Sequence, residues 1–506
     1  ITASAGTSNF RAGVNAGNSI VSGGNYNTVV GDEAGTAITT GDLMTAVGYK
    51  ALFTEDTGER STAVGAYALT LQNSAVENYN VAVGYNAGGA VTTGVNNTLI
   101  GGLAGDAITT GDANVAVGHA SLSANTTGEN NTALGQASLL ANTTGYQNVG
   151  IGINALGSNT TANNNVAVGV NGLLVNTTGT SNTALGSFAL DANTTASNNT
   201  AVGYASLGAN TTGQQNTAVG GLCLDANTTG DYNNAFGYLA LTRNTTGVRN
   251  TALARSTLET NTTGSYNVAV GMDALAANTT ADNNTAVGYL SLSANTTGPR
   301  NTGIGGSAGA SITTGDNNTC LGYNSGVATT TLTTGYQNTL IGTYVHTSAV
   351  DTAAAFGLGY NLSCEGGYTT LGAGASDIRA AHGNVTWATV SDERYKKDIV
   401  DSTAGLSFIN ALQPRTFKYK TLGELPETFR AYEADSTEVF KNANTNHGFI
   451  AQEVKAAIDA DSSIADGFRL WDDRDDGSQE VAEAALIPIL VKAIQELTAR
   501  ITTLEG

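Results

Sequence analysis

Hydrophobic and polar positions repeat along most of the chain with a period of seventeen residues. The repeat has the form N-T-A-V-G-Y-x-S-L-x-x-N-T-T-G-x-x, as from Asn199 to Gly213, and short insertions precede Gly84 and Gly342. A fixed short period predicts stacked supersecondary units, and seventeen residues are too few for a pair of helices. We therefore expect a β-solenoid with one coil per repeat. The glycines that mark the period include Gly31, Gly48, Gly65, Gly101, Gly118, Gly135, Gly152, Gly169, Gly186, Gly203, Gly220 and Gly237, then Gly271, Gly288, Gly305 and Gly322, with Ala254 at the one substituted position.

Within a repeat, large and small residues alternate just before the marking glycine. Val268 and Val270 point to one side of the predicted strand, and Ala269 and Gly271 point to the other. We expect the large side chains to fill the core of the coil. The small ones would then form a wall that another backbone can approach closely.

A second apolar row and a turn complete the predicted coil. The N-T-T-G stretch predicts a turn in which glycine adopts positive φ and asparagine hydrogen-bonds its own backbone. The apolar row lies four residues after the marking glycine, as at Leu207, Leu224, Leu241, Leu258, Leu275 and Leu292.

These features predict a mainly β fold, a solenoid that ends in a separate tip. A single thin coil buries little surface by itself, so the wall of small residues indicates that copies of the chain associate. The solenoid is expected to span residues 1–345. Residues 346–390 break the period and contain Tyr360, Tyr368 and Trp387. We expect them to form the tip of a fibre, where a receptor binds.

The composition changes abruptly near residue 391. Residues 1–390 contain 28 charged side chains, about 7%, whereas residues 391–506 contain 34, about 29%. Three of the four prolines also lie in this second part. Residues 391–506 therefore form a separate domain of a different kind.

The net charge and the residue types exclude several classes of function. A net charge of −20 disfavours nucleic acid, which requires clustered Lys and Arg. No run of 18 apolar residues occurs, so we expect no membrane insertion. The four histidines lack metal-ligand spacing, and we expect neither a metal nor a cofactor. Cys223, Cys320 and Cys364 are expected to be small buried residues.

The repeats resemble two kinds of fibrous protein. The V-A-V-G pattern resembles the head repeats of trimeric autotransporter adhesins, which form a trimeric β-roll. The N-T-A-V-G-Y pattern is similar to repeats in fibre and appendage proteins of tailed phages. The adhesin resemblance implies a homotrimer.

Four motifs after residue 390 resemble the intramolecular chaperone domains of phage endosialidases and tail spikes, the peptidase S74 family. The motifs occur in the family's order, and the resemblance implies a small α+β domain that drives trimerisation. They are S-D-E-R-Y-K-K-D-I from Ser391, L-Q-P-R-T-F-K-Y from Leu412, G-F-I-A-Q-E-V from Gly448, and the segment from Leu486 to Leu497.

This resemblance also implies self-cleavage. It assigns Ser391 as the nucleophile, Lys396 as the base and Val390–Ser391 as the scissile bond, attacked directly or through a shift to an ester. A serine hydroxyl needs a neutral base beside it, and a lysine serves when its pKa is lowered. The alternative is that Ser391 and Asp392 only cap a helix.

The C-terminus carries a heptad stripe with spacings of 3, 4, 3, 4 and 3 residues. Such a stripe predicts a coiled-coil helix. Alternating Ile and Leu favour a dimer in an isolated zipper, whereas the family resemblance implies a trimer, which we expect here. The alternative is a core helix packed within one chain. The stripe consists of Ile487, Leu490, Ile494, Leu497, Ile501 and Leu504.

Three functions are compatible with the sequence. The first is a homotrimeric phage tail fibre on the virion, which binds a host-surface glycan or protein receptor and whose only enzymatic act is cutting itself. The second is a bacterial cell-surface adhesin made of the same modules. The third, a polysaccharide depolymerase, is disfavoured because acidic residues are sparse in 1–390 and aromatic residues make up only 6% of the chain.

Overall fold

The computed structural model describes residues 6–327, 329–383, 388–389, 393, 396–429, 431–461, 464, 470–473 and 477–505. The chain forms two compact units, Ile1–Val390 and Ser391–Gly506.

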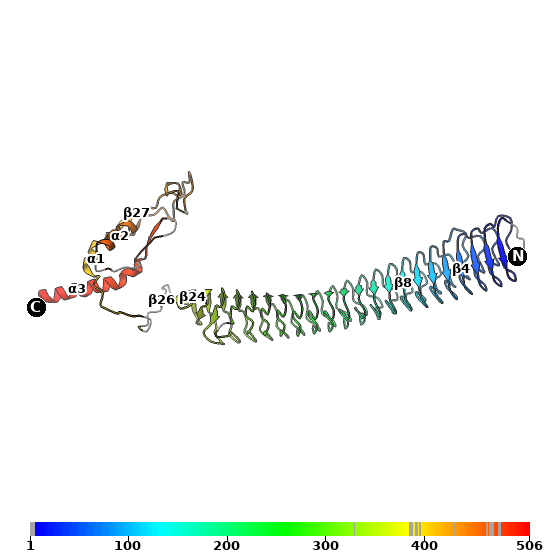
Figure 1. The fold of residues 1–506 in the computed structure, drawn as a ribbon, viewed down its shortest axis with the longest axis horizontal. Helices are drawn as coiled ribbons and strands as arrows, with labels where there is room; N and C mark the ends of the chain where they lie inside the picture. The colour runs from blue at the N-terminus through cyan, green and yellow to red at the C-terminus, as the bar shows by residue number, and fades with distance from the viewer. Residues whose placement is uncertain are drawn as a thin grey trace. The chain divides into compact units, whose positions relative to one another are not determined.

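The first unit is a β-solenoid whose short strands stack in parallel (Figure 1). Neighbouring strands pair one repeat apart, as Thr200 pairs with Thr217. The strands are β1 Phe10–Ala12, β2 Thr28–Val30, β3 Thr45–Val47, β4 Thr62–Val64, β5 Val81–Val83, β6 Thr98–Ile100, β7 Val115–Val117, β8 Thr132–Leu134, β9 Val149–Ile151, β10 Val166–Val168, β11 Thr183–Leu185, β12 Thr200–Val202, β13 Thr217–Val219, β14 Asn234–Phe236, β15 Thr251–Leu253, β16 Val268–Val270, β17 Thr285–Val287, β18 Thr302–Ile304, β19 Thr319–Leu321, β20 Thr339–Ile341 and β22 Phe356–Tyr360.

The solenoid continues beyond the expected boundary at residue 345. Strand β22 pairs with β20 in the same seventeen-residue register, Thr339 opposite Phe356. Strand β24 (Tyr368–Ala373) adds a last parallel rung, and β25 (Ser376–Ala381) and β26 (Ala388–Thr389) close the sheet antiparallel. A small side sheet pairs β21 (His346–Thr347) with β23 (Ser363–Cys364). Part of the expected tip therefore completes the solenoid.

The expected orientation of the strand residues is wrong. Ala269 is fully buried, whereas 39% of Val268 is exposed and Val270 is half-buried. The coil is so narrow that an alanine and a leucine from the opposite side fill it. Leu275 is fully buried, which confirms the predicted leucine row at this position. The wall of small residues thus lies inside each coil and offers no surface to a second chain.

The N-T-T-G prediction is confirmed in one part and wrong in another. Asn210 Nδ2 donates to the carbonyl of Gly213 at 2.9 Å, as expected, and it also bonds Asn193 in the preceding coil. Gly213 does not adopt positive φ, whereas the marking glycine Gly203 does, at +134°. Gly213 is needed for room instead, because a Cβ there would lie 2.5 Å from the carbonyl oxygen of Gly230 in the next coil.

The three cysteines are small buried residues, as expected, and none forms a disulfide. Burial raises the pKa of the Cys223 and Cys320 thiols to about 12.

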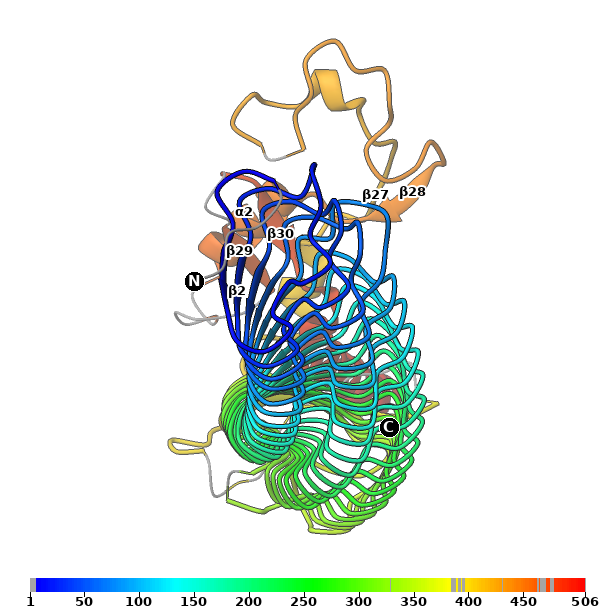
Figure 2. The ribbon, with the colours of Figure 1, turned by 90° about the vertical axis from the view of Figure 1, so that its right-hand side faces the viewer.

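The coils rotate steadily along the solenoid, as Figure 2 shows nearly end-on. This twist is that of parallel β-strands stacked on one another.

The second unit is a small α+β domain. Its helices are α1 (Leu406–Ala411), α2 (Ala451–Ala460) and α3 (Ile487–Glu505), with short 3₁₀ helices η2 (Leu422–Glu424) and η3 (Glu483–Leu486). Two antiparallel pairs join β27 (Arg415–Phe417) to β28 (Asn446–Gly448) and β29 (Trp471–Asp473) to β30 (Gln479–Val481). Its core contains Ala404, Phe408, Leu412, Val454, Leu470, Leu486 and Ile489.

Candidate self-cleavage and assembly site

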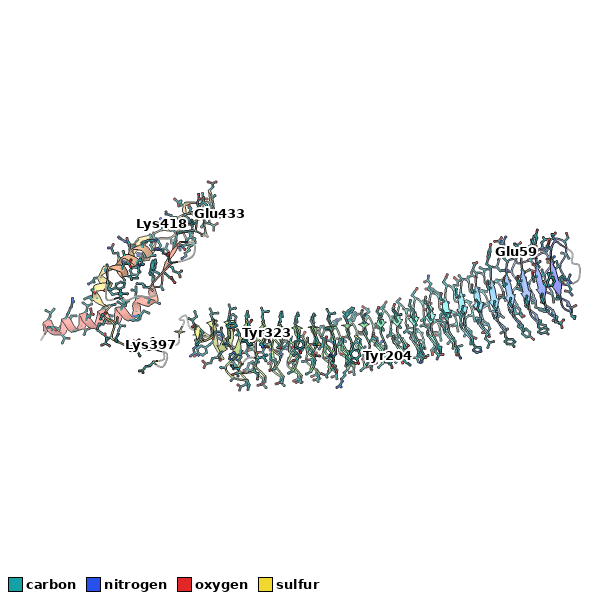
Figure 3. The ribbon with its side chains drawn as sticks, in the orientation of Figure 1. Glu59, Tyr204, Tyr323, Lys397, Lys418 and Glu433 are labelled. Carbon is teal, nitrogen blue, oxygen red and sulfur yellow. The ribbon has the colours of Figure 1, made fainter. Side chains whose placement is uncertain are left out.

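The predicted scissile bond lies outside the described residues. Val390, Ser391 and Trp387 belong to that part of the chain, and the proposed pairing of Ser391 with Lys396 therefore stays a prediction. Lys396 itself is described and exposed, and its backbone N–H donates to the carbonyl of Glu393 at 2.9 Å. Lys397, labelled in Figure 3, is exposed as well.

An exposed segment leads from these lysines to the first helix of the unit. Ile399 and Val400 are 62% and 86% exposed, which leaves two apolar side chains uncovered beside the lysines. The segment enters the core at Ala404, and α1 follows with Phe408 completely buried. The core of the unit thus holds one end of the segment that carries Lys396.

Glu496 of α3 holds the start of α1. The backbone N–H of Leu406 donates to Glu496 Oε2 at 3.0 Å, although the two residues are 90 positions apart. A carboxylate at a helix start satisfies an N–H group that has no partner within the helix. A Cβ at Gly405 would lie 2.5 Å from Glu496 Oε1, so glycine leaves room for this contact. The contact fixes α1 against α3.

Two of the predicted motifs come together in space. Strand β27 lies in the motif that begins at Leu412 and pairs with β28, which ends at Gly448, the first residue of the next motif. Arg415 then donates Nε and Nη2 to the two carboxylate oxygens of Glu453, at 2.9 and 2.7 Å. These hydrogen bonds lower the pKa of the Glu453 carboxyl. Sequence reasoning identified both motifs but not this contact, because 38 residues separate its partners.

Helix α3 has two different faces. Ile489 and Ala493 are buried against the rest of the unit, and Glu496 continues that face. The heptad stripe lies on the other side and is uncovered, so α3 packs within one chain through Ile489 and Ala493 but not through the stripe. The exposed fractions are 61% for Ile487, 42% for Leu490, 61% for Ile494, 43% for Leu497, 52% for Ile501 and 87% for Leu504.

Comparison with known families identifies this unit. Residues 391–461 match the family model Peptidase_S74, described as chaperone of endosialidase. The C-terminal unit carries a domain of the endosialidase-chaperone family. The match includes Ser391, Lys396 and the motifs that hold Arg415 and Glu453, and it ends before α3. Searches of curated proteins and of solved structures gave no significant match.

The rest of the described chain offers few other sites. Within the described ranges, no three His, Cys, Asp or Glu side chains are grouped closely enough to hold a metal ion. None of the described helices is both long and apolar enough to cross a membrane. At the end of the solenoid, Arg379 lies over the ring of Tyr368, 5.1 Å from its centroid, and bonds Glu365 at 2.6 Å.

Proposed function

We propose that this chain is the subunit of a homotrimeric fibre, and that its endosialidase-chaperone domain assembles three chains and then removes itself. The observation that carries the proposal is the position of that domain. It follows a long β-solenoid directly, and the border between the two units falls at the predicted scissile bond, Val390–Ser391.

The uncovered stripe of α3 supports the trimeric state. Six apolar side chains at heptad spacing would lie in water in a monomer, and burying each fully is worth about 1.5–3 kcal/mol. A helix with this spacing packs its stripe against equivalent helices. Three chains joined through α3 would hold their C-terminal units together while the solenoids fold.

The proposed cleavage uses only residues of this chain. Ser391 Oγ attacks the carbonyl carbon of Val390 while the neutral amine of Lys396 accepts the hydroxyl proton. The C–N bond breaks, the freed Ser391 amine takes that proton, and Val390 is left as an ester on Ser391 Oγ. One water molecule hydrolyses the ester, which yields a solenoid ending at Val390 and a fragment beginning at Ser391.

The removal of the domain would make assembly irreversible. The fibre loses the part that brought its chains together, so its persistence depends on its barrier to unfolding. We place this fibre on a virion as a tail fibre or related appendage, where it attaches to a host-surface glycan or protein. The support is the family of the domain, a chaperone of endosialidase, together with the fibrous solenoid.

The experiment follows chain mass and assembly during refolding. We expect sedimentation to show trimers, and mass spectrometry with N-terminal sequencing to find a 116-residue fragment that begins at Ser391. Ser391→Ala and Lys396→Ala should give uncut trimers of full-length chains. Ser402→Ala is the matched control, since it removes a nearby exposed hydroxyl and should leave scission unchanged.

Two results would contradict the proposal separately. A wild-type chain that forms trimers but keeps its full mass of 51.1 kDa would remove the cleavage and leave an assembly domain. A folded wild-type monomer at micromolar concentration would remove the trimer.

A further inference from the structure

The outward face of the solenoid sheet carries no charged residue over twenty successive strands. From β2 to β20 and in β22, the third residue of each strand is Val, Ile, Leu or Phe. The first residue of each of these strands is Thr, Val, Asn or Phe. Both residues point outward, because the middle residue faces the core of the coil. We call these two rows the outward face.

The absence of charge on this face is not a property of the whole surface. The chain has a net charge of −20, and the coils carry Asp191, Asp225, Asp231, Arg249 and Asp282, all between the strands. An exposed sheet face in a monomeric protein usually alternates buried apolar residues with polar residues toward water. Here the residues toward water are apolar or β-branched in every strand except β14, which begins with Asn234.

The outward face is also large. Leu134, Leu185, Leu253 and Leu321 in the third row are 41–47% exposed. Ten of the twenty third-row residues are 36–47% exposed, and the other ten are half-buried. The apolar row thus runs the length of the solenoid, whereas a monomeric protein rarely exposes one contiguous apolar patch of more than a few hundred Å².

We propose that the outward face is the surface on which the solenoids of identical chains pack side by side, parallel and in register. This inference rests on the proposed trimer and names the part of the solenoid that forms it. The occupant is a second copy of the chain, because parallel chains in register around a threefold axis bring the residues that lie close to the axis near their own equivalents. Charged rows would then meet like charges, which is unfavourable, whereas an uncharged apolar row is complementary to itself.

Exposed tyrosines border the outward face. Tyr204, Tyr238, Tyr289 and Tyr323 each follow the marking glycine of a coil and are 52–60% exposed. Tyr204 and Tyr323 are labelled in Figure 3. Tyrosine is enriched at protein interfaces, where its ring is covered and its hydroxyl stays near water. Their place beside the apolar rows fits the edge of an interface between chains.

The test uses single cysteines in an uncut trimer. In the Ser391→Ala background, Thr251→Cys and Leu253→Cys place a thiol on the outward face at the two ends of β15. Thr246→Cys places one in the exposed N-T-T-G segment just before β15, as the matched control. The native cysteines do not interfere, because all three are buried. Each variant is oxidised, or treated with a short bis-maleimide, and run on a denaturing gel without reductant.

We expect a cross-linked pair of chains from Thr251→Cys or Leu253→Cys, and at least tenfold less from Thr246→Cys. Sedimentation of the same samples reports the trimer independently. A trimer in which neither outward-face variant cross-links, or in which Thr246→Cys cross-links as well as they do, would overturn the proposed face and leave the trimer standing. A monomer by sedimentation would contradict the trimer itself, and the proposed face with it.

Discussion

The side-chain Nδ2 of Asn210 donates a hydrogen bond to Oδ1 of Asn193, 3.1 Å away and one coil earlier in the solenoid. The same bond recurs in every coil from Asn125 to Asn295, and each Nδ2 also donates to a carbonyl three residues ahead. All these asparagines are buried, so the interior of the solenoid contains a continuous ladder of amides. Because every coil repeats the position, each amide finds its partner in the neighbouring coil.

The ladder has a visible end. Ile312 occupies the next equivalent position, so Asn295 Oδ1 is left buried without a hydrogen-bond partner. A buried polar atom without a partner costs about 1–3 kcal/mol. Asn295 Oδ1 is thus the acceptor left without a partner where this buried row changes from asparagine to isoleucine.

Replacing an asparagine inside the ladder should cost more than replacing the last one. Asn210→Ala leaves Asn193 Oδ1 without a donor, and we expect the free energy of unfolding to fall by about 1–3 kcal/mol. Asn295→Ala orphans Asn278 Oδ1 but removes the acceptor that was already orphaned, so it should cost about 1 kcal/mol less. Denaturant unfolding of both variants checks this, and equal losses would contradict the ladder.

Ala254 should be a strained residue. It takes the place of a marking glycine and keeps the glycine conformation, with φ of +130°. Ala254→Gly should raise the free energy of unfolding by about 1 kcal/mol, because glycine adopts this φ without strain. Gly271→Ala, at the equivalent position of the next coil, should lower it, since its Cβ would lie 2.7 Å from the backbone of Gly288. Thermal unfolding compares the two, and a loss of stability in Ala254→Gly would show that no strain is present.

Enlarging the inward strand residue should damage each coil from within. Ala269→Leu adds three carbons to a fully buried position, and overpacking costs about 1–3 kcal/mol. Val268→Leu adds one carbon at a neighbouring position that is 39% exposed, and should change stability much less. Chemical denaturation of the solenoid measures both. An Ala269→Leu variant as stable as wild type would mean that the coil core holds spare volume.

The buried thiols should be unreactive at alkaline pH. Burial raises the pKa of Cys223 and Cys320 to about 12, so at pH 9 the folded chain keeps them protonated. In the unfolded chain a thiol deprotonates near about 8.5. The unfolded state therefore loses protons first, and stability falls as the pH rises above that value. Mass spectrometry after alkylation at pH 9 should find unmodified thiols in folded protein and three modified ones after denaturation.

The residues between Leu412 and Glu453 illustrate what sequence and structure each contribute to the C-terminal unit. Their two motifs are among the four that indicated the family from residue types and order, since each occurs as contiguous letters. The bidentate bond of Arg415 to Glu453 and the support of α1 by Glu496 required the fold, because each joins segments far apart in the chain.

In the solenoid, residue spacing alone predicts the period, the coil and the leucine row. The side of each strand that faces inward depends on how the whole coil closes. A three-residue strand such as Val268–Val270 alternates equally well in either direction, and only the narrow closed coil selects the alanine for its core. The local bond of each asparagine to a carbonyl three residues ahead was predictable, whereas its bond to the asparagine of the neighbouring coil was not, because those two residues meet only when the coils are stacked.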